Sequence, residues 1–192
     1  MRFETFAPLD QLDFIIHAFT LRTDDDSKAE EFQSQLLRQF GFSDCASAEQ
    51  THGNAVAVVT SPGHVAGVDA LVTRQRSLPL VIRCADCAPV FLVDRHTPAI
   101  ALVHSGKKGT LASIVSNTLQ AMPARPNLAF IGPSIGPCHY EMDLWSAIEH
   151  QLAGIAEVHN PRVCTACHLD RYFSYRAENG NTGRMFAVLS LR

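Results

Sequence analysis

Short apolar runs separated by turn residues dominate the pattern of this chain. Runs rich in Val, Ile and Leu that end at Gly, Pro, Asp or Ser are typical of β-strands. Such runs predict strands over residues 14–20, 54–60, 70–73, 78–84, 89–94, 99–104, 127–132 and 186–191. The chain is therefore expected to be rich in sheet.

Apolar residues at helical spacing predict fewer helices. A helix over 28–41 would begin with Ser27 and Glu30 at capping-box spacing, and another would begin at Asp143. The clearest periodicity predicts one helix over 110–122, closed by Pro123. Its apolar face would consist of Leu111, Ile114, Val115, Thr118, Leu119 and Met122.

Strands outnumber helices and do not alternate with them strictly. This order favours an α+β fold with mixed sheets covered by helices over a doubly wound parallel sheet. At 192 residues the chain fits one domain, residues 1–192.

Composition and charge exclude several classes of function. An apolar content of 46% with 18% charged residues is that of a globular protein. The formal net charge of −3 provides no basic field for nucleic acid or for an anionic membrane. The most apolar stretch, 78–93, contains Arg83 and Asp86, and the first residues do not resemble a signal peptide. We therefore expect a cytoplasmic protein whose six cysteines are mostly reduced. The expected assembly is a monomer or weak homodimer.

Three potential metal ligands occur at three separate strand–turn junctions. They are His52 in Q-T-H-G, Cys87 in C-A-D-C-A-P and His104 in V-H-S-G-K-K-G. Two imidazoles and one thiolate would hold zinc with one coordination position open, as in a hydrolytic site. An alternative is a closed four-cysteine zinc site made by the pairs Cys84/Cys87 and Cys164/Cys167. Their separation exceeds the usual ribbon spacing, and the first pair enters an apolar run, so this alternative is weaker.

Charged residues near these junctions suggest substrate contacts. Lys107 and Lys108 lie in S-G-K-K-G, where glycines and ammonium groups together suit a phosphate or carboxylate. Asp69 in G-V-D-A-L-V-T could orient a ligating histidine, or could simply form a turn. The loop from Gly132 to Glu141 could line a pocket or act as a stiff connector.

An ordered set of motifs resembles a known family. Q-T-H-G, D-A-L-V-T, A-D-C-A-P-V, A-L-V-H-S-G-K-K-G, G-P-S-I-G-P-C-H-Y-E and the terminal Y-F-S-Y-R with T-G-R are similar to those of the multicopper polyphenol oxidase (laccase-domain) family. This is also called the peptidoglycan-editing factor family and is related to the human laccase-domain-containing purine nucleoside phosphorylase. The resemblance runs from His17 to the last strand.

The resemblance implies a fold, a metal and an activity. It implies a single domain with mixed sheets sandwiched by helices in an αββα-like order. It also implies zinc, with copper possible, bound by His52, Cys87 and His104. The activities it implies are phosphorolysis of adenosine, inosine or methylthioadenosine and deamination of adenosine. Where the family has H-A-G-W-[RK]-G this chain has Lys107 in place of the Trp, which removes an aromatic surface and adds a cation.

The working hypothesis is a zinc-dependent purine nucleoside phosphorylase and adenosine deaminase, a metal-dependent transferase and hydrolase. Zinc would activate water for attack at purine C6, and Arg22, Arg83, Lys107 or Lys108 would position phosphate. Candidate proton carriers are Asp69, Asp86 and Glu141. The alternatives are a hydrolase that edits a cell-wall precursor with Cys87 as nucleophile, a polyphenol oxidase, and a catalytically inactive relative that binds nucleotides.

Overall fold

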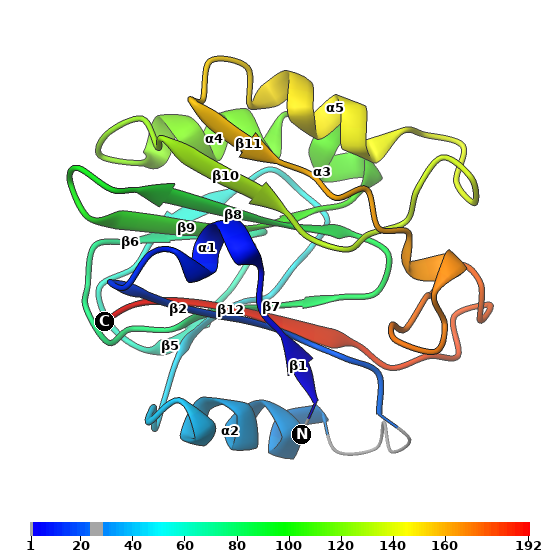
Figure 1. Ribbon diagram of the computed structural model, residues 1–192, viewed down its shortest axis with the longest axis horizontal. Coiled ribbons are helices and arrows are strands. Elements are labelled where there is room, and N and C mark those ends of the chain that lie inside the picture. Colours follow the sequence, from blue (N-terminus) through cyan, green and yellow to red (C-terminus); the bar gives the residue numbers. More distant parts are fainter. Residues whose placement is uncertain (1, 24–28) are drawn as a thin grey trace.

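Two mixed β-sheets are stacked face to face and covered by helices on both outer faces. The structure is a computed structural model that describes residues 2–23 and 29–192. Figure 1 shows helix α2 below one sheet and helices α3, α4 and α5 above the other. The predicted α+β sandwich is therefore confirmed.

The first sheet, sheet A, has six strands in the order β1-β2-β12-β7-β3-β5. Strand β12 pairs antiparallel with both β2 and β7, whereas β3 pairs parallel with β7 and β5. Its strands are β1 (Phe3–Glu4), β2 (Ile15–Thr20), β3 (Ala46–Ala48), β5 (Gly63–Val65), β7 (Leu80–Cys84) and β12 (Met185–Leu191).

The second sheet, sheet B, has six strands in the order β11-β10-β8-β9-β6-β4. Strands β10, β8, β9 and β6 pair antiparallel in turn. The edge strand β11 pairs parallel with β10, and the edge strand β4 pairs parallel with β6. Its strands are β4 (Val56–Val58), β6 (Ala70–Thr73), β8 (Ala88–Asp94), β9 (Ala99–Ser105), β10 (Leu128–Ile131) and β11 (Glu157–His159).

Sheet B is covered on both faces, which explains its continuous apolar runs. All seven residues of β8 are buried. Phe91 and Val93 pack between the sheets, and Val90 and Leu92 pack under the helices. The helices are α1 (Ala7–Asp10), α2 (Ala29–Gln39), α3 (Lys107–Leu111), α4 (Ile114–Ala121) and α5 (Leu144–Gln151), with a 3₁₀ turn η2 at Thr165–Cys167. In the part of the chain that the structure describes, no helix is both long and apolar enough to cross a bilayer.

The strands predicted from apolar runs are confirmed, and the short strands β1, β3, β5 and β11 were missed. Strand β1 has two residues and the other three strands have three residues each. Strands β5 and β11 also include His64 and Glu157, so no apolar run marks these segments. The helix after Asp143 is confirmed, because the Asp143 carboxylate accepts a hydrogen bond from the Ser146 N–H at 3.1 Å. Helix α2 lies within the predicted 28–41. Its predicted capping box depends on Ser27, which lies outside the described residues.

The single helix predicted over 110–122 is wrong. Two helices, α3 and α4, meet at Ser113, whose φ of 65° is left-handed. The Gln151 side chain of α5 accepts the N–H groups of Val115 and Ser116, which begin α4. Leu111, predicted to be on the apolar face, is 67% exposed. The periodicity was misleading because the apolar residues of α4 alone supply most of the pattern.

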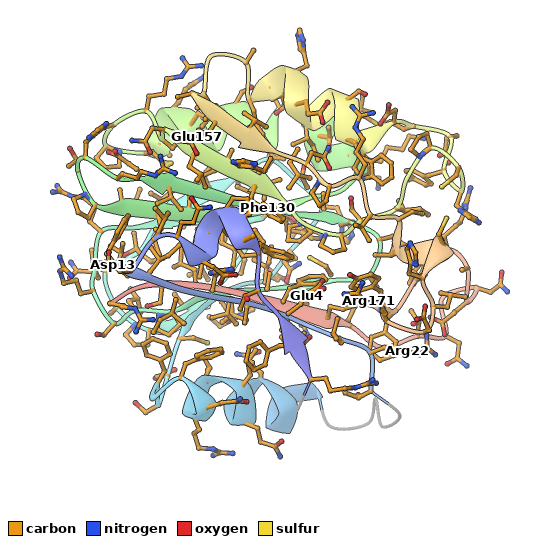
Figure 2. All side chains as sticks on the ribbon, viewed as in Figure 1. Glu4, Asp13, Arg22, Phe130, Glu157 and Arg171 are labelled. Atoms are coloured by element: carbon orange, nitrogen blue, oxygen red, sulfur yellow. The ribbon has the colours of Figure 1, made fainter. Side chains whose placement is uncertain are left out.

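The first strand is joined to the segment that precedes β12. Glu4 of β1 forms an ion pair with Arg171 and accepts a hydrogen bond from the Tyr172 hydroxyl at 2.8 Å. Figure 2 shows Glu4 and Arg171 side by side near the C-terminal segment. The segment 160–184, which has little regular structure, is therefore anchored to the first strand.

His17 is a buried histidine of β2 that acts as a hydrogen-bond acceptor. Its Nε2 accepts the backbone N–H of Phe6 at 2.8 Å, and its ring stacks on the Phe6 ring. Burial lowers the pKa of His17 to about 4, although the nearby Asp10 carboxylate opposes this. A protonated ring would lose the bond to Phe6, so the folded state requires neutral His17.

We predict that stability falls as the pH drops through the window set by His17. The unfolded imidazole binds a proton near pH ~6.5 and the folded one only near pH 4, so the unfolded state binds more protons between these values. The contribution lost is at most about 3 kcal/mol. Urea unfolding across this range should show a weaker pH dependence for His17→Gln than for wild type. His150→Gln, at an exposed position, is the control. An equal pH dependence in wild type and His17→Gln would contradict the prediction.

Candidate metal centre and its cavity

Three potential metal ligands from distant parts of the sequence meet at one end of sheet B. His52 lies in the turn between β3 and β4, Cys87 in the turn between β7 and β8, and His104 in β9. Their ligand atoms all lie within 4.8 Å of one another. The rings of His52 and His104 are 5.0 Å apart, with their planes at 78°. The structure thus brings the three predicted ligands together.

Asp69, fully buried just before β6, organises two of these ligands. Its Oδ1 accepts hydrogen bonds from His104 Nδ1 and from the backbone N–H of His52, both at 2.9 Å. Its Oδ2 accepts from the Gly53 N–H at 2.8 Å and from the Thr51 hydroxyl at 3.1 Å. Because Asp69 engages Nδ1, the Nε2 atom of His104 is the one left to act as a ligand.

The electrostatics of the site favour a thiolate. Burial by itself raises the pKa of Cys87, but hydrogen bonds with His104 and His52 outweigh it and bring the pKa to about 6. Burial disfavours charge on His104, yet Asp69 and Cys87 raise the pKa of its ring to about 9. Burial likewise raises the pKa of Asp69, but the hydrogen bond from His104 and the Gly53 N–H bring it below its ordinary value. The site therefore holds an ionised sulfur, the form of cysteine that binds metals and acts as a nucleophile.

Close approach of the backbone to the sulfur requires glycine at position 106. A Cβ atom there would lie 2.6 Å from Cys87 Sγ and 3.5 Å from His52 Cδ2. The Gly106 φ of −94° is accessible to any residue, so steric contact rather than backbone conformation excludes a side chain.

The turns that carry the ligands have unusual backbone conformations. Gln50, His52 and Asp86 have φ values of 68°, 62° and 82°. Such left-handed geometry costs about 1–2 kcal/mol per non-glycine residue and persists only where other contacts hold it. For His52 those contacts are the hydrogen bonds to Asp69. For Asp86 they are three hydrogen bonds to its carboxylate, from the Thr165 and Ser174 hydroxyls and the Arg176 N–H, each at 2.7 Å.

This ligand set fits a metal ion with an open coordination position. Two imidazoles and one thiolate are the soft and borderline donors that zinc and copper prefer. Three protein ligands leave a fourth tetrahedral position, and the three side chains line a cavity of about 760 Å³ that this position would face. The site therefore has the composition of a catalytic rather than a structural metal centre.

The cavity is rich in cations. Its lining includes the aromatic residues Tyr140 and Tyr175 and the acidic residues Glu49 and Asp86. The cationic residues of the lining are Arg83, Lys107, Lys108, Arg176 and Arg184. Lys107 pairs with Glu141 at 2.8 Å and Arg176 pairs with the same carboxylate at 3.3 Å, so two cations share one acid. The cavity thus suits an anionic substrate.

Comparison with known proteins identifies the family. The chain matches the family model described as multi-copper polyphenol oxidoreductase laccase over residues 7–143 and 140–192. It belongs to this laccase family. A purine nucleoside phosphorylase of Deinococcus radiodurans is 32% identical over 203 residues, which cover 88% of this chain and 80% of that protein. The purine nucleoside phosphorylase YlmD of Geobacillus stearothermophilus is 26% identical, over 98% of this chain and 86% of that protein.

Solved structures share the fold. The crystal structure of YlmD from Geobacillus stearothermophilus has a TM-score of 0.86 at 24% identity, covering 94% of this chain and 93% of that one. A Bacillus licheniformis protein, YfiH, gives a TM-score of 0.86 at 20% identity and covers 99% of both chains. This chain therefore has the same fold as these two solved structures.

The predicted substrate contacts of this laccase-family chain fall into two groups. Arg83, Lys107 and Lys108 line the cavity. Arg22 is not among the lining residues, because it pairs with Glu178 at 2.7 Å and lies over the Phe173 ring. Figure 2 shows Arg22 near the end of the C-terminal segment, at the level of sheet A.

Several cavity residues were given no role from the sequence. Tyr175, Arg176 and Arg184 come from the motif Y-F-S-Y-R with T-G-R, which was noted only for its family resemblance. Their segment has little regular structure, so no periodicity places it at the site. The one feature of the sequence that could have indicated these residues was the place of this motif in the ordered set of family motifs.

The alternative four-cysteine site is wrong. Cys84 is fully buried in β7 and belongs to no metal-spaced group among residues 2–23 and 29–192. Cys164 and Cys167 lie instead beside Cys138 and His139. Cys84 therefore packs in the core, whereas Cys87, three residues later, belongs to the metal centre.

We predict that Asp69→Asn weakens metal binding at this centre. Loss of such a supporting carboxylate typically costs about 10–100-fold in metal affinity. In metal-free protein at neutral pH, Cys87 should react readily with iodoacetamide, because its pKa of about 6 makes it largely thiolate. Zinc should protect Cys87 from alkylation. Mass spectrometry of the Cys87 peptide measures this protection, and therefore zinc binding, at this centre only.

The zinc concentration that gives half-protection should rise about 10–100-fold in Asp69→Asn. Asp170→Asn, at an exposed position, should leave it unchanged. Equal half-protection in wild type and Asp69→Asn would remove Asp69 from the metal centre.

Proposed function

We propose that this protein is a zinc-dependent purine nucleoside phosphorylase that also deaminates adenosine. The observation that carries the proposal is the position of the His52–Cys87–His104 centre inside a cavity lined by five cationic side chains. Relatives named purine nucleoside phosphorylases support it. The substrates would be a purine nucleoside, such as adenosine, inosine or methylthioadenosine, and inorganic phosphate.

The metal would be held by His52, Cys87 and His104. Zinc in such a site supplies Lewis acidity and lowers the pKa of a bound water towards about 7. Copper would suit the same donors, and the donor set alone does not separate the two metals. Asp69 would keep His104 in the tautomer that presents Nε2, and Gly106 would leave room for the sulfur.

The cations would hold phosphate. No acidic side chain pairs with Arg83 or Lys108 among the residues that the structure describes, so both remain available to an anion. Arg176 and Lys107 share only Glu141. Phosphate held by this group would attack ribose C1′, the C1′–N9 bond would break, and the purine would leave with the bonding electrons and take up a proton.

The aromatic residues would accept the base. Tyr175 is 54% exposed and lines the cavity, and Tyr140 lines it from the other loop. These rings would provide the apolar surface that is lost where Lys107 replaces the family Trp.

The carboxylates predicted as proton carriers have positioning contacts. Asp69 accepts four hydrogen bonds and Asp86 accepts three. Hydrogen bonding to Lys107 lowers the pKa of the exposed Glu141 carboxylate, which favours its ionised form. We assign Asp69 to the metal centre, Asp86 to anchoring the loop that carries Arg176, and Glu141 to balancing the cations.

We further propose that the protein works in the cytoplasm. All six of its cysteines are free thiols, which suits a reducing compartment and the thiolate that the metal centre needs. A monomer or weak homodimer remains the expected assembly.

The proposal predicts phosphate-dependent release of base. Zinc-loaded protein should convert adenosine and phosphate to adenine and ribose 1-phosphate, and should release inosine and ammonia without phosphate. His52→Ala should abolish both reactions, because it removes a metal ligand. Turnover that is absent from the zinc-loaded wild type, or equal in His52→Ala, would reject the proposal.

A second prediction concerns the phosphate site. Arg176→Gln and Lys108→Gln should each raise the KM for phosphate about tenfold or more, since a hydrogen bond to a charged group contributes about 1.5–3 kcal/mol. The KM for the nucleoside should change little. Arg162→Gln, which breaks a surface pair with Glu149, is the matched control. An unchanged KM for phosphate in both variants would place the anion elsewhere.

One observation favours a second candidate function. Cys87, His104 and Asp69 are hydrogen-bonded in the order of a nucleophile, base and orienting acid. Cys87 could therefore attack an amide carbonyl, as in hydrolysis of a cell-wall precursor. A chelator separates the two functions, because it would stop the zinc enzyme and leave a cysteine hydrolase active.

Polyphenol oxidation is not favoured by the residues. Multicopper chemistry uses several histidine-rich copper sites, whereas in the described parts of the chain only two clusters have metal-ligand spacing, and one is rich in cysteine.

A further inference from the structure

A second cluster of potential metal ligands lies outside the cavity that His52, Cys87 and His104 line. Cys138 and His139 come from the loop between β10 and α5. Cys164 directly precedes the turn η2, and Cys167 is its last residue. Their four ligand atoms all lie within 4.8 Å of one another. The cluster shares no residue with the His52–Cys87–His104 centre.

The distances within the cluster match the edges of a zinc tetrahedron. With Zn–S near 2.3 Å and Zn–N near 2.05 Å, tetrahedral geometry places two sulfurs about 3.8 Å apart and sulfur and nitrogen about 3.6 Å apart. Cys138 Sγ and Cys167 Sγ are 3.6 Å apart. His139 Nδ1 lies 3.3, 3.8 and 3.5 Å from the sulfurs of Cys138, Cys164 and Cys167. A disulfide would instead bring two sulfurs to about 2.05 Å.

The backbone holds Cys164 in position before any ion binds. The Gly136 N–H donates to Cys164 Sγ at 3.2 Å, a contact that stabilises a thiolate. Ser134 joins the two segments, since its N–H donates to Val163 O at 3.1 Å and its carbonyl accepts the Thr165 N–H at 3.2 Å. The position of Cys164 thus follows from contacts that are independent of the thiols of Cys138 and Cys167.

We propose that Cys138, His139, Cys164 and Cys167 bind a structural zinc ion. Three thiolates and one imidazole complete a tetrahedron and leave no position for substrate, which is the composition of a structural rather than a catalytic site. The pair Cys164-x-x-Cys167 has the ligand spacing of such sites. The thiolate-rich set favours zinc over the hard cations magnesium and calcium.

The ion would hold together two segments that form one wall of the cavity beside the His52–Cys87–His104 centre. Cys138 lies two residues before Tyr140, and Cys167 precedes the stretch that carries Tyr175 and Arg176. Arg176 lies 5.5 Å over the Tyr140 ring and contacts Glu141 across the same junction. Zinc at the cluster would therefore fix the position of the wall without touching substrate.

Zinc content of purified variants tests the site. Elemental analysis of wild type, expressed with zinc and dialysed in reducing buffer, should give two zinc ions per chain. His52→Ala should retain one, and Cys138→Ser/Cys167→Ser should also retain one. Cys45→Ser is the matched control, because Cys45 belongs to neither cluster, and it should retain two. Unchanged zinc in Cys138→Ser/Cys167→Ser would overturn the proposal. So would a wild type that holds only one ion, if His52→Ala then holds none.

A measurement on wild type covers the case in which the double variant does not fold. Cys138 and Cys167 are exposed, so a pulse of iodoacetamide on the native metal-free protein should label both. Zinc should slow labelling of these two peptides by an order of magnitude or more, also in His52→Ala. Equal labelling with and without zinc would overturn the proposal, as would a Cys138–Cys167 disulfide in protein purified in reducing buffer.

Discussion

The buried carboxylate of Asp69 is the constraint on which the metal centre depends. Its two oxygens accept four hydrogen bonds. The donors are the His104 ring, the backbone N–H of His52, and the two neighbours of His52 in the chain, Thr51 and Gly53. A buried carboxylate is costly unless its partners are supplied in full, and here they are supplied by the turn and strand that carry His52 and His104. The same interaction therefore selects the left-handed turn, the histidine tautomer and the charge beside Cys87.

The fold explains how this carboxylate reaches all of its partners. Asp69 precedes β6, Cys87 precedes β8 and His104 lies one residue before the end of β9. These strands are neighbours in sheet B, and the ends that carry the three residues lie on the same side. The turn of His52 joins β3 of sheet A to β4 of sheet B. The centre thus lies where the chain passes between the layers. The cavity wall is completed by the C-terminal segment, which Glu4, Asp86 and Ser134 anchor at three points.

Sequence patterns were sufficient where local chemistry decides the structure. The buried strands were predictable because their residues are apolar on both faces. The three ligands were predictable because each follows or ends an apolar run at a strand–turn junction. The break at Ser113 was not predictable, because it depends on Gln151 reaching from another helix. Arg176 and Arg184 were missed for a similar reason, since an irregular segment is placed by tertiary contacts. The pairing of Cys164 with Cys138 rather than with Cys84 also depends on the approach of two loops that no periodicity describes.

The central claim is that His52, Cys87 and His104 bind one metal ion with an open position. The most direct measurement is a crystal structure with anomalous difference maps collected on both sides of the zinc absorption edge. The account predicts a zinc peak at about 2.0–2.3 Å from one nitrogen of each histidine and from Cys87 Sγ, with a non-protein ligand facing the cavity. Zinc-loaded crystals with no peak at that position, or with the three side chains pointing apart, would contradict it.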